Sequence, residues 1–271
     1  MKTLKRIAAG ILSAALLLGM TSCAAKQTEA SAEADTAAFT TVESGKLIMA
    51  TNAFFPPYEY YEGEKIVGID VEIATAVAQK LGLELVIEDV EFDSIIAGVQ
   101  SGKYDIGCAG MTVTEDRLKS VNFSTPYATG IQSIIVAADS EITDIDMLLA
   151  GDYKVGVQSG TTGDIYMSSS VEDGGVGEER IERFAKGNDA VIALTSGKID
   201  AVVIDNEPAK AFVAANAGLK ILETPYTVED YAMAINKDNV ALKDAINQAL
   251  KELTDDGTIA AIVNKYIPAE G

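Results

Sequence analysis

The amino-acid sequence predicts an α/β protein with two lobes and a ligand-binding cleft between them. Two observations lead to this prediction. Short β-rich runs alternate with helical patterns over most of the chain, as expected for largely parallel sheets with helices on both faces. One helix-turn-strand pattern also occurs twice, which indicates two comparable units. The length of 271 residues suits two lobes of roughly 100 residues each.

The first run of elements follows this alternation from residue 47 onward. Leu47–Thr51 is short and apolar, which predicts a buried strand. Asp70–Leu81 brings Ile73 and Val77 onto one face, which predicts an amphipathic helix. The alternation continues with a strand at Leu83–Glu88, a helix at Asp93–Ser101 and a strand at Asp105–Ala109.

The same alternation resumes in the second half of the chain. Lys154–Val157 and Ala201–Ile204 are short apolar runs that predict strands. The longer segments Asn188–Ser196 and Glu207–Ala217 have helical patterns. Two further helices are predicted near the end of the chain, at Asp238–Leu253 and Thr258–Tyr266.

The repeated pattern is a helix, a Ser-Gly-Lys turn and a short apolar strand. Ser101–Asp105 in the first half matches Ser196–Asp200 in the second, and eight residues beyond the two turn glycines lie Gly110 and Asp205. These two residues are therefore expected at equivalent strand ends, one in each lobe, where ligands of open α/β sheets bind. The alternative is a coincidental turn signal, because Ser-Gly-Lys is a good helix terminator.

The composition is that of an acidic globular protein. Hydrophobic residues make up 48% and charged residues 23%, and 21 basic against 41 acidic side chains give a formal net charge of −20. Such a surface repels phosphate backbones, so we expect no nucleic-acid partner. The chain has no histidine, and its cysteines are Cys23 and Cys108. Zinc sites built on histidine or paired cysteines and histidine-based triads are excluded, and we expect neither a metal nor a cofactor.

Residues 1–22 have the pattern of a secretory signal peptide. Three basic residues in the first six positions precede an apolar run from Ile7 to Met20, too short for a comfortable membrane span. Small residues precede Cys23, so we expect cleavage there and a lipid on Cys23; the alternative is a plain signal peptide that contains a cysteine. Residues 23–44 then read as a flexible tether, and Cys108 as an unpaired, buried thiol.

Aromatic residues are candidates for the walls of the cleft. Two prolines stiffen the loop Asn52–Tyr58, which displays Phe55, and Phe92 lies in a second loop. We expect the two rings to face each other across a pocket. A turn with core-facing phenylalanines has the same sequence pattern.

Arg117 is the candidate for binding an anion. It follows a predicted strand end in the run Gly110–Arg117, and a guanidinium offers two parallel donors that match a carboxylate. Thr112 is expected to add its hydroxyl and backbone N–H, and Gly110 its carbonyl. The alternative is that Thr114 caps a helix while Arg117 pairs with a neighbouring acid on the surface.

Two further loops carry the remaining polar candidates. Gln158–Asp164 is a Gly/Thr loop before a short helix, and backbone amides at such a position favour an anion. It lacks the lysine of a nucleotide phosphate loop, so we do not expect ATP to bind. Asp205 ends an apolar strand, and its carboxylate is suited to an ammonium group unless it caps the next helix. An arginine and an amide-lined loop with an aspartate opposite complement an α-amino acid.

Six motifs lie along the body of the chain: Ala50–Glu59, Val67–Glu72, Gln100–Asp105, Gly110–Arg117, Phe123–Tyr127 and Gly160–Thr162. Together they resemble the extracytoplasmic solute-binding proteins of amino-acid ABC importers of the polar-amino-acid type, over Gly45 to Ile267. The resemblance implies a two-lobe, type II periplasmic-binding-protein-like fold with mixed sheets and two hinge crossovers. Lobe 1 would comprise residues 45–131 plus 231–271, and lobe 2 residues 132–230.

The same resemblance implies roles for the polar candidates. Arg117, with Thr112 and the backbone amide of Thr162, is similar to the family's carboxylate-binding group. Asp205 and the carbonyl of Gly110 are similar to its acceptors for the ligand ammonium.

The ligand side chain is implied to contact a second group of residues. Phe55 and Phe92 match positions that sandwich it, while Asn52 and Gln158 match positions that tune specificity. Relatives that bind cations often have an acidic group near Asn52, so we expect a neutral or polar amino acid here. The expected site is completed by Met111 and Thr161.

The function implied is capture of an L-amino acid by cleft closure and delivery to ABC permease subunits with a separate ATPase. The protein would act outside the cytoplasm as a monomer, held to the membrane by its N-terminal lipid. The main alternative is an enzyme like cyclohexadienyl or arogenate dehydratase, since a few dehydratases share this fold. Without histidine, its acid or base would have to be Asp, Glu, Lys or Tyr. A sensory ectodomain, which would usually continue into a spanning helix, is a third possibility.

Overall fold

The computed structural model of the chain describes residues 39–223 and 227–268. The predicted signal peptide, Cys23 and most of the predicted tether lie outside these residues. The end of the expected tether contacts the folded body. The backbone N–H of Val42 donates to Asp105 Oδ1 over 2.8 Å, and Asn239 Nδ2 donates to the carbonyl of Thr40 over 2.8 Å.

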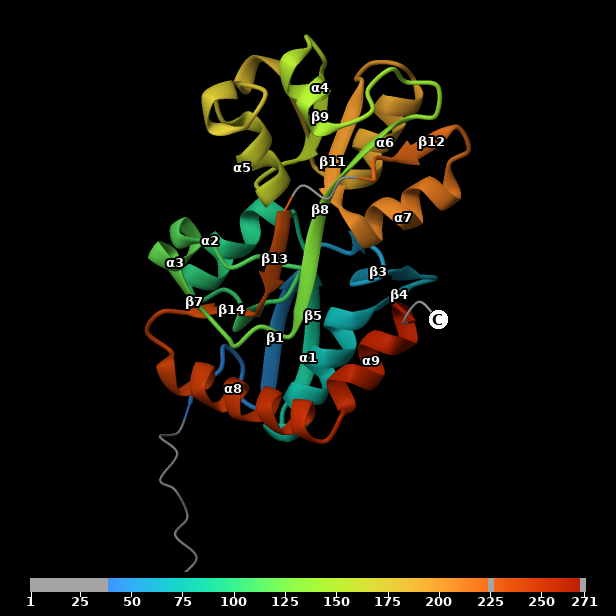
Figure 1. The fold of residues 1–271 in the computed structure, drawn as a ribbon. Helices are drawn as coiled ribbons and strands as arrows, with labels where there is room; N and C mark the ends of the chain where they lie inside the picture. The colour runs from blue at the N-terminus through green and yellow to red at the C-terminus, as the bar shows by residue number, and fades with distance from the viewer. Residues whose placement is uncertain (1–38, 224–226, 269–271) are drawn as a thin grey trace, which may run out of the picture. The chain divides into compact units, whose positions relative to one another are not determined.

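One half of the fold is built on a five-stranded sheet in the order β5-β1-β6-β14-β7 (Figure 1). The first strand lies parallel to β5 and β6, whereas β14 is antiparallel to β6 and β7. A separate three-stranded sheet has the order β2-β3-β4. The bounds are β1 (Lys46–Thr51), β2 (Phe54–Phe55), β3 (Glu59–Glu62), β4 (Lys65–Val67), β5 (Glu84–Asp89), β6 (Ile106–Gly107), β7 (Val121–Phe123) and β14 (Ala234–Asn236).

The helices of this half come from both ends of the described chain. The first helix packs with the last two, while α2 contacts β1, β6 and β14. These helices are α1 (Ile69–Lys80), α2 (Ile95–Gln100), α3 (Glu115–Ser120), α8 (Val240–Asp255) and α9 (Thr258–Tyr266).

The other half is built on a six-stranded sheet in the order β10-β9-β11-β8-β12, with β13 also paired to β8. Three strands are parallel, whereas β8 is antiparallel to each of its partners. The strands are β8 (Ala128–Ala137), β9 (Val155–Gln158), β10 (Ile181–Phe184), β11 (Ala201–Asp205), β12 (Leu219–Ile221) and β13 (Thr227–Tyr231). The helices are α4 (Ile145–Ala150), α5 (Thr162–Ser168), α6 (Gly187–Thr195) and α7 (Asn206–Ala215).

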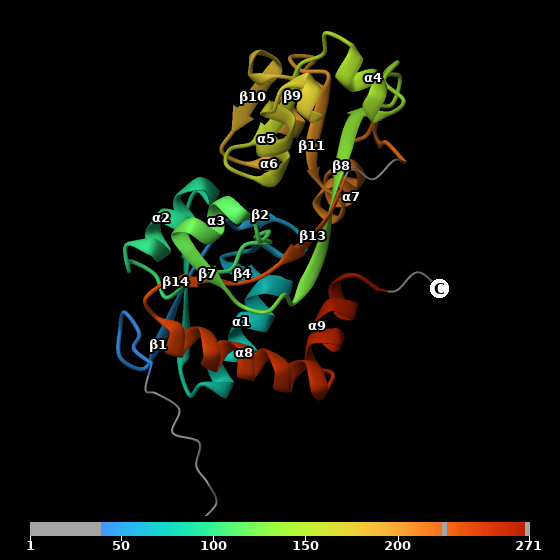
Figure 2. The same ribbon diagram turned by 60° about the vertical axis from the view of Figure 1, so that its left-hand side comes forward.

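Two strands connect the halves. The whole of β13 pairs with residues 128–132 of β8, and the rest of β8 pairs with β11 and β12. Both views of the ribbon show β8 and β13 side by side where the chain passes between the two sheets (Figures 1 and 2). The prediction of mixed sheets flanked by helices and joined by two crossovers is confirmed.

The repeated sequence pattern corresponds to a repeated structure. Gly102 after α2 has φ +74°, and Gly197 after α6 has φ +70°, as expected for glycines that end helices. The strands that follow, β6 and β11, each lie parallel to one neighbour and antiparallel to the other. The match is incomplete at the strand ends, because β11 reaches Asp205 whereas β6 stops at Gly107, short of the predicted Ala109.

Apolar packing holds each sheet against its helices. Leu47, Ile73 and Val77 are fully buried in one core cluster, as the sequence pattern predicts. Cys108 is a fully buried free thiol in the same cluster. The segment predicted as a helix from Asp93 begins with a 3₁₀ turn, Phe92–Ser94, before α2; this turn places Phe92 near the cleft.

Candidate functional site

The predicted site residues converge on one cavity between the two sheets. Its free volume is about 10 Å³, room for about one water molecule. Met111 is absent from the lining, because its side chain is fully buried in a core cluster of the first half. The lining residues are Asn52, Phe55, Glu59, Phe92, Ala109, Gly110, Thr112, Arg117, Gln158, Thr161, Thr162 and Asp205.

A larger cavity of about 500 Å³ lies along residues 126–131. Of the predicted site residues, Asp205 alone lines it. It therefore lacks the arginine and the Gly/Thr loop that complement an amino acid.

Arg117 is held across the cleft by backbone carbonyls. Its Nη1 donates to Thr112 O over 2.7 Å and its Nη2 to Gly160 O over 3.0 Å. Thr114 caps α3, as in the alternative interpretation, but Arg117 is only 8% exposed, and the neighbouring Asp116 pairs with Lys119. Burial lowers the pKa of Arg117, yet a guanidinium stays protonated in proteins. The two carbonyls use two of its five N–H donors, which leaves others for a carboxylate.

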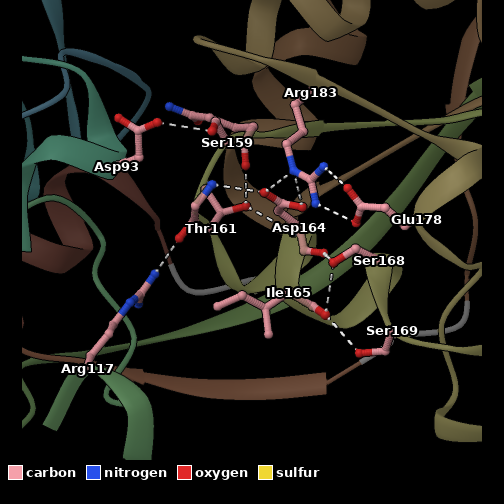
Figure 3. Close-up of polar contacts among 12 residues, drawn as sticks. Asp93, Arg117, Ser159, Thr161, Asp164, Ile165, Ser168, Ser169, Glu178 and Arg183 are labelled. Carbon is pink, nitrogen blue, oxygen red and sulfur yellow. Dashed lines mark hydrogen bonds and ion pairs between the residues drawn. The ribbon is translucent and has the colours of Figure 1, made fainter. Parts of the chain in front are cut away.

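The Gly/Thr loop opposite Arg117 is braced by an ion-pair network. Asp164 Oδ2 accepts from the backbone N–H of Gly160 over 3.0 Å and from Arg183 Nε over 2.8 Å. Arg183 also pairs with Glu178. Figure 3 shows Arg117 reaching toward this loop from the first half, while Ser159 donates to Asp93 over 3.0 Å. The loop is therefore fixed from both sides.

Asp205 occupies the N-cap position of α7, but its side chain makes no capping bond. Its Oδ2 accepts from Gln132 Nε2 over 2.8 Å, and its Oδ1 accepts from the hydroxyl of Tyr231. Burial raises the pKa of Asp205 to about 7. Asp205 lines the cavity, where a cation would favour the ionised form of its carboxyl group.

The aromatic and amide candidates line the same cavity. Phe92 lies 5.5 Å from the Arg117 guanidinium, measured from its ring centroid. Gln158 Nε2 donates to Asn52 Oδ1 over 2.9 Å, so these two amides bind each other across the cleft. This contact leaves each amide with fewer hydrogen-bonding groups for a ligand.

Glu59 lines the cavity although the sequence analysis gave it no role. It is 1% exposed, and neither carboxyl oxygen has a hydrogen-bond partner among the described residues. Burial, reinforced by the charge of Asp70, raises the pKa of Glu59 well above its ordinary value. Its signal was the last position of the Ala50–Glu59 motif, but an acid at that position also fits an exposed strand.

Glu229 and Gln132 are the other functional candidates that sequence reasoning missed. Glu229 Oε2 accepts from the hydroxyls of Thr112 and Thr162 over 3.0 and 2.9 Å. Gln132 Nε2 donates to both Glu229 and Asp205. Both residues lie on the crossover strands, and their sequence neighbourhoods carry no motif of a binding loop.

Two kinds of feature are absent from the described residues. No cluster of three or more side chains suited to a metal ion occurs among them. Nor does that part of the chain contain a helix long and apolar enough to cross a membrane.

Residues 47–269 match the bacterial extracellular solute-binding proteins, family 3. The chain belongs to this family. Arginine-binding extracellular protein ArtP of Bacillus subtilis is 35% identical over 233 residues, which cover 84% of this chain and 89% of that protein.

Solved structures of solute-binding proteins align over the body of the chain. An ancestral arginine-binding protein bound to glutamine has a TM-score of 0.76 and 38% identity, covering 83% of this chain and 99% of that one. The arginine-, lysine-, histidine-binding protein ArtJ from Geobacillus stearothermophilus has a TM-score of 0.76 and 31% identity, covering 83% and 96%. These likenesses confirm the two-lobe periplasmic-binding-protein-like fold and a binding protein rather than the dehydratase-like enzyme.

Proposed function

We propose that this solute-binding protein captures an L-amino acid with a cationic side chain and delivers it to ABC permease subunits with a separate ATPase. The observation that carries the ligand class is the buried carboxyl group of Glu59, neither oxygen of which has a donor among the described residues. Oε1 of Gln132 and Oε1 of Glu229 also lack a donor there, but they belong to the group around Asp205. Carboxylate and amide oxygens accept hydrogen bonds. A guanidinium or ammonium group supplies the N–H donors and the positive charge that the Glu59 carboxylate requires.

The charges around the cavity support the same ligand class. Among the lining residues Arg117 is positive, while Glu59 and Asp205 are acidic, and Glu229 bonds to two lining hydroxyls. A neutral zwitterion leaves this excess of acid unchanged. A cationic side chain offsets one acidic charge, which lowers the cost of burying the site.

The geometry suggests how the ligand is oriented. Arg117 would take the α-carboxylate, and Asp205 the α-ammonium group. The side chain would then extend between Phe55 and Phe92 toward Glu59. This arrangement pairs every charge of a dibasic amino acid with an opposite charge.

A neutral amino acid is the second candidate, and Asn52 favours it. That amide lines the cavity at the position where an acid was expected for a cationic ligand. The relatives supply both classes of ligand, since ArtP is an arginine-binding protein and an ancestral arginine-binding protein is bound to glutamine. The two candidates differ in what Glu59 would contact.

Binding requires the cleft to open. The cavity of about 10 Å³ is smaller than an amino acid, so the proposed lobes, residues 45–131 with 231–271 and residues 132–230, must separate about β8 and β13. An open cleft hydrates Arg117 and the acids, whereas a closed one buries them, so a ligand that pairs them drives closure. Lipid on Cys23 would hold a monomeric receptor beside its permease.

Titration calorimetry of the purified protein tests the ligand class. We expect L-arginine, L-lysine and L-ornithine to bind at least about tenfold more tightly than L-glutamine and L-asparagine, because hydrogen bonds to charged groups contribute about 1.5–3 kcal/mol. Tighter binding of the neutral pair would favour the second candidate. Failure of all twenty common amino acids and ornithine to bind would overturn the proposed function.

Two variants place the ligand within the cavity. Glu59→Gln keeps the side-chain size and should weaken L-arginine about tenfold while changing L-glutamine less than about threefold. Glu62→Gln, an exposed position on the same strand, is the matched control. Arg117→Ala should weaken both ligands about a hundredfold. An unchanged preference for L-arginine in Glu59→Gln would exclude Glu59 from the cation site.

A further inference from the structure

Glu229 joins the two sides of the cleft through one oxygen. The residue lies on β13 and is 5% exposed. Its Oε2 accepts from the Thr112 hydroxyl over 3.0 Å and from the Thr162 hydroxyl over 2.9 Å. The first threonine belongs to the half with β1, and the second begins α5 in the other half.

These bonds determine what the two hydroxyls can offer a ligand. A threonine hydroxyl has one proton and two acceptor lone pairs. At Thr112 and Thr162 the proton is directed to Glu229, and both residues line the cavity. Hydroxyls oriented in this way can accept from an N–H group of the ligand, but they have no proton left for a carboxylate.

We infer that Glu229 is a positioning residue that makes Thr112 and Thr162 acceptors for the ligand's α-ammonium group. The inference rests on the proposed function of amino-acid capture, but it holds for cationic and neutral amino acids alike. It places the Thr112 hydroxyl at the ammonium end of the site rather than at the carboxylate end, where the sequence analysis expected it.

The neighbouring groups are consistent with an ammonium site. Gln132 Nε2 donates to Asp205 over 2.8 Å and to Glu229 over 3.1 Å, and lies 3.3 Å from Thr162 Oγ1. This one amide group therefore brings Asp205, Glu229 and Thr162 together. Oε1 of Gln132 and of Glu229 have no donor among the described residues, so they add further acceptors beside Asp205.

The test compares an amino acid with the same molecule lacking its α-ammonium group. L-Arginine is paired with 5-guanidinopentanoic acid, and L-glutamine with glutaramic acid, by titration calorimetry. In Glu229→Gln, the amide offers N–H donors where the carboxylate oxygen accepted, so the hydroxyl protons lose their fixed direction. We expect the preference for the amino acid over its des-amino partner to fall about tenfold, with the des-amino affinity nearly unchanged.

Two further variants separate positioning from folding. Asp230→Asn removes the same charge from an exposed neighbour on β13 and should leave the preference ratio unchanged. Thr112→Val removes one acceptor, so it should lower the ratio, and adding Glu229→Gln should then have a smaller effect than in the wild type.

The possible outcomes are distinguishable. One such outcome is that Glu229→Gln weakens the amino acid and its des-amino analogue equally, and another is that its effect is fully additive with that of Thr112→Val. Either result would overturn the positioning role, and Glu229 would then only connect the two halves structurally. Should Glu229→Gln fail to fold, an unchanged ratio in Thr112→Val alone overturns the inference. Failure of the wild type to bind either amino acid would instead overturn the proposed function on which it rests.

Discussion

At the residue scale, the site and the core beside it contain acids that are buried without a full set of partners. Burial raises the pKa of Asp205 to about 7 and that of Asp70 to about 6, although hydrogen bonds from neighbouring groups oppose both shifts. Glu59 is shifted upward by burial and by the charge of Asp70. These groups hold protons at pH values where exposed carboxyls are ionised, which reduces the cost of burying several charges together.

The raised pKa values predict opposite pH trends for stability and ligand affinity. A carboxyl whose pKa is higher in the fold than in the unfolded chain stabilises the fold at low pH, and this contribution is lost as the pH rises through the folded pKa. We expect the unfolding temperature to fall between about pH 4, where carboxyls of the unfolded chain ionise, and about pH 7, the folded pKa of Asp205. Affinity for L-arginine should rise over the same window, by up to about tenfold per pH unit for each proton released.

Scanning calorimetry and ligand titration across this pH range measure the two trends. Asp205→Asn should remove the part of both trends near pH 7 and leave the part of the stability trend that Asp70 contributes near pH 6. An L-arginine affinity that stays level over the whole range would contradict a cation beside these acids.

At the element scale, the close pairing of β8 with β13 positions the site. The two strands pair at Gly130 and Glu229, and a Cβ at Gly130 would overlap the phenol ring of Tyr231. The ring reaches Asp205 through its hydroxyl. The glycine therefore makes room for the side chain that orients the aspartate.

Gly130→Ala is expected to disturb this crossover. The added methyl group forces Tyr231 to move, and overpacking of this kind costs about 1–3 kcal/mol. Urea unfolding should show this loss, with Thr129→Ala, an exposed position on the same strand, changing stability by less than about 0.5 kcal/mol. If Gly130→Ala is as stable as the wild type, β8 and Tyr231 on β13 can move apart to admit the methyl group without a loss in the free energy of unfolding.

At the scale of the whole folded body, polar contacts cross the cleft directly. Gln158 donates to Asn52 over 2.9 Å, Arg117 to the carbonyl of Gly160 over 3.0 Å, and Ser159 to Asp93 over 3.0 Å. Asn52, Arg117 and Gln158 line the cavity, and Asp93 and Ser159 each follow a lining residue in the chain. The closed arrangement is thus stabilised by contacts between the halves as well as by a ligand that fills the site.

Gly160→Ala should weaken ligand binding by opposing closure. A Cβ at Gly160 would lie 2.9 Å from Asp93 Cβ across the cleft, so the alanine disfavours the closed arrangement. We expect amino-acid affinity to fall about tenfold, as measured by titration calorimetry.

Gly197→Ala is the matched control for this variant. Gly160 and Gly197 have φ +74° and +70°, so both alanines carry a similar backbone cost of about 1–2 kcal/mol. A Cβ at Gly197 has no atom within 4 Å, so its substitution should lower stability without lowering affinity. Equal affinity losses in the two variants would show that backbone strain, rather than closure, is responsible.

The structure brings together predicted residues whose type and place near a strand end agreed. Arg117 and Asp205 satisfied both conditions, and the structure brings them to one cavity. Met111 lies within the same motif, but its side chain turns into the core. Glu229 escaped prediction because it meets Thr112 across 117 positions of sequence, and no local pattern reports a contact at that separation.

The sequence alone determined the two α/β units, their matching turns and the strand-end loops that hold the polar candidates, because hydrophobic periodicity and turn residues act over a few positions. The three-dimensional structure decided the charge balance of the site. Both oxygens of Glu59, Oε1 of Gln132 and Oε1 of Glu229 lack donors among the described residues only because distant strands bury these side chains together. Burial and long-range contacts determine whether these groups carry a proton and whether they donate or accept hydrogen bonds. Neither property is encoded in a short stretch of sequence.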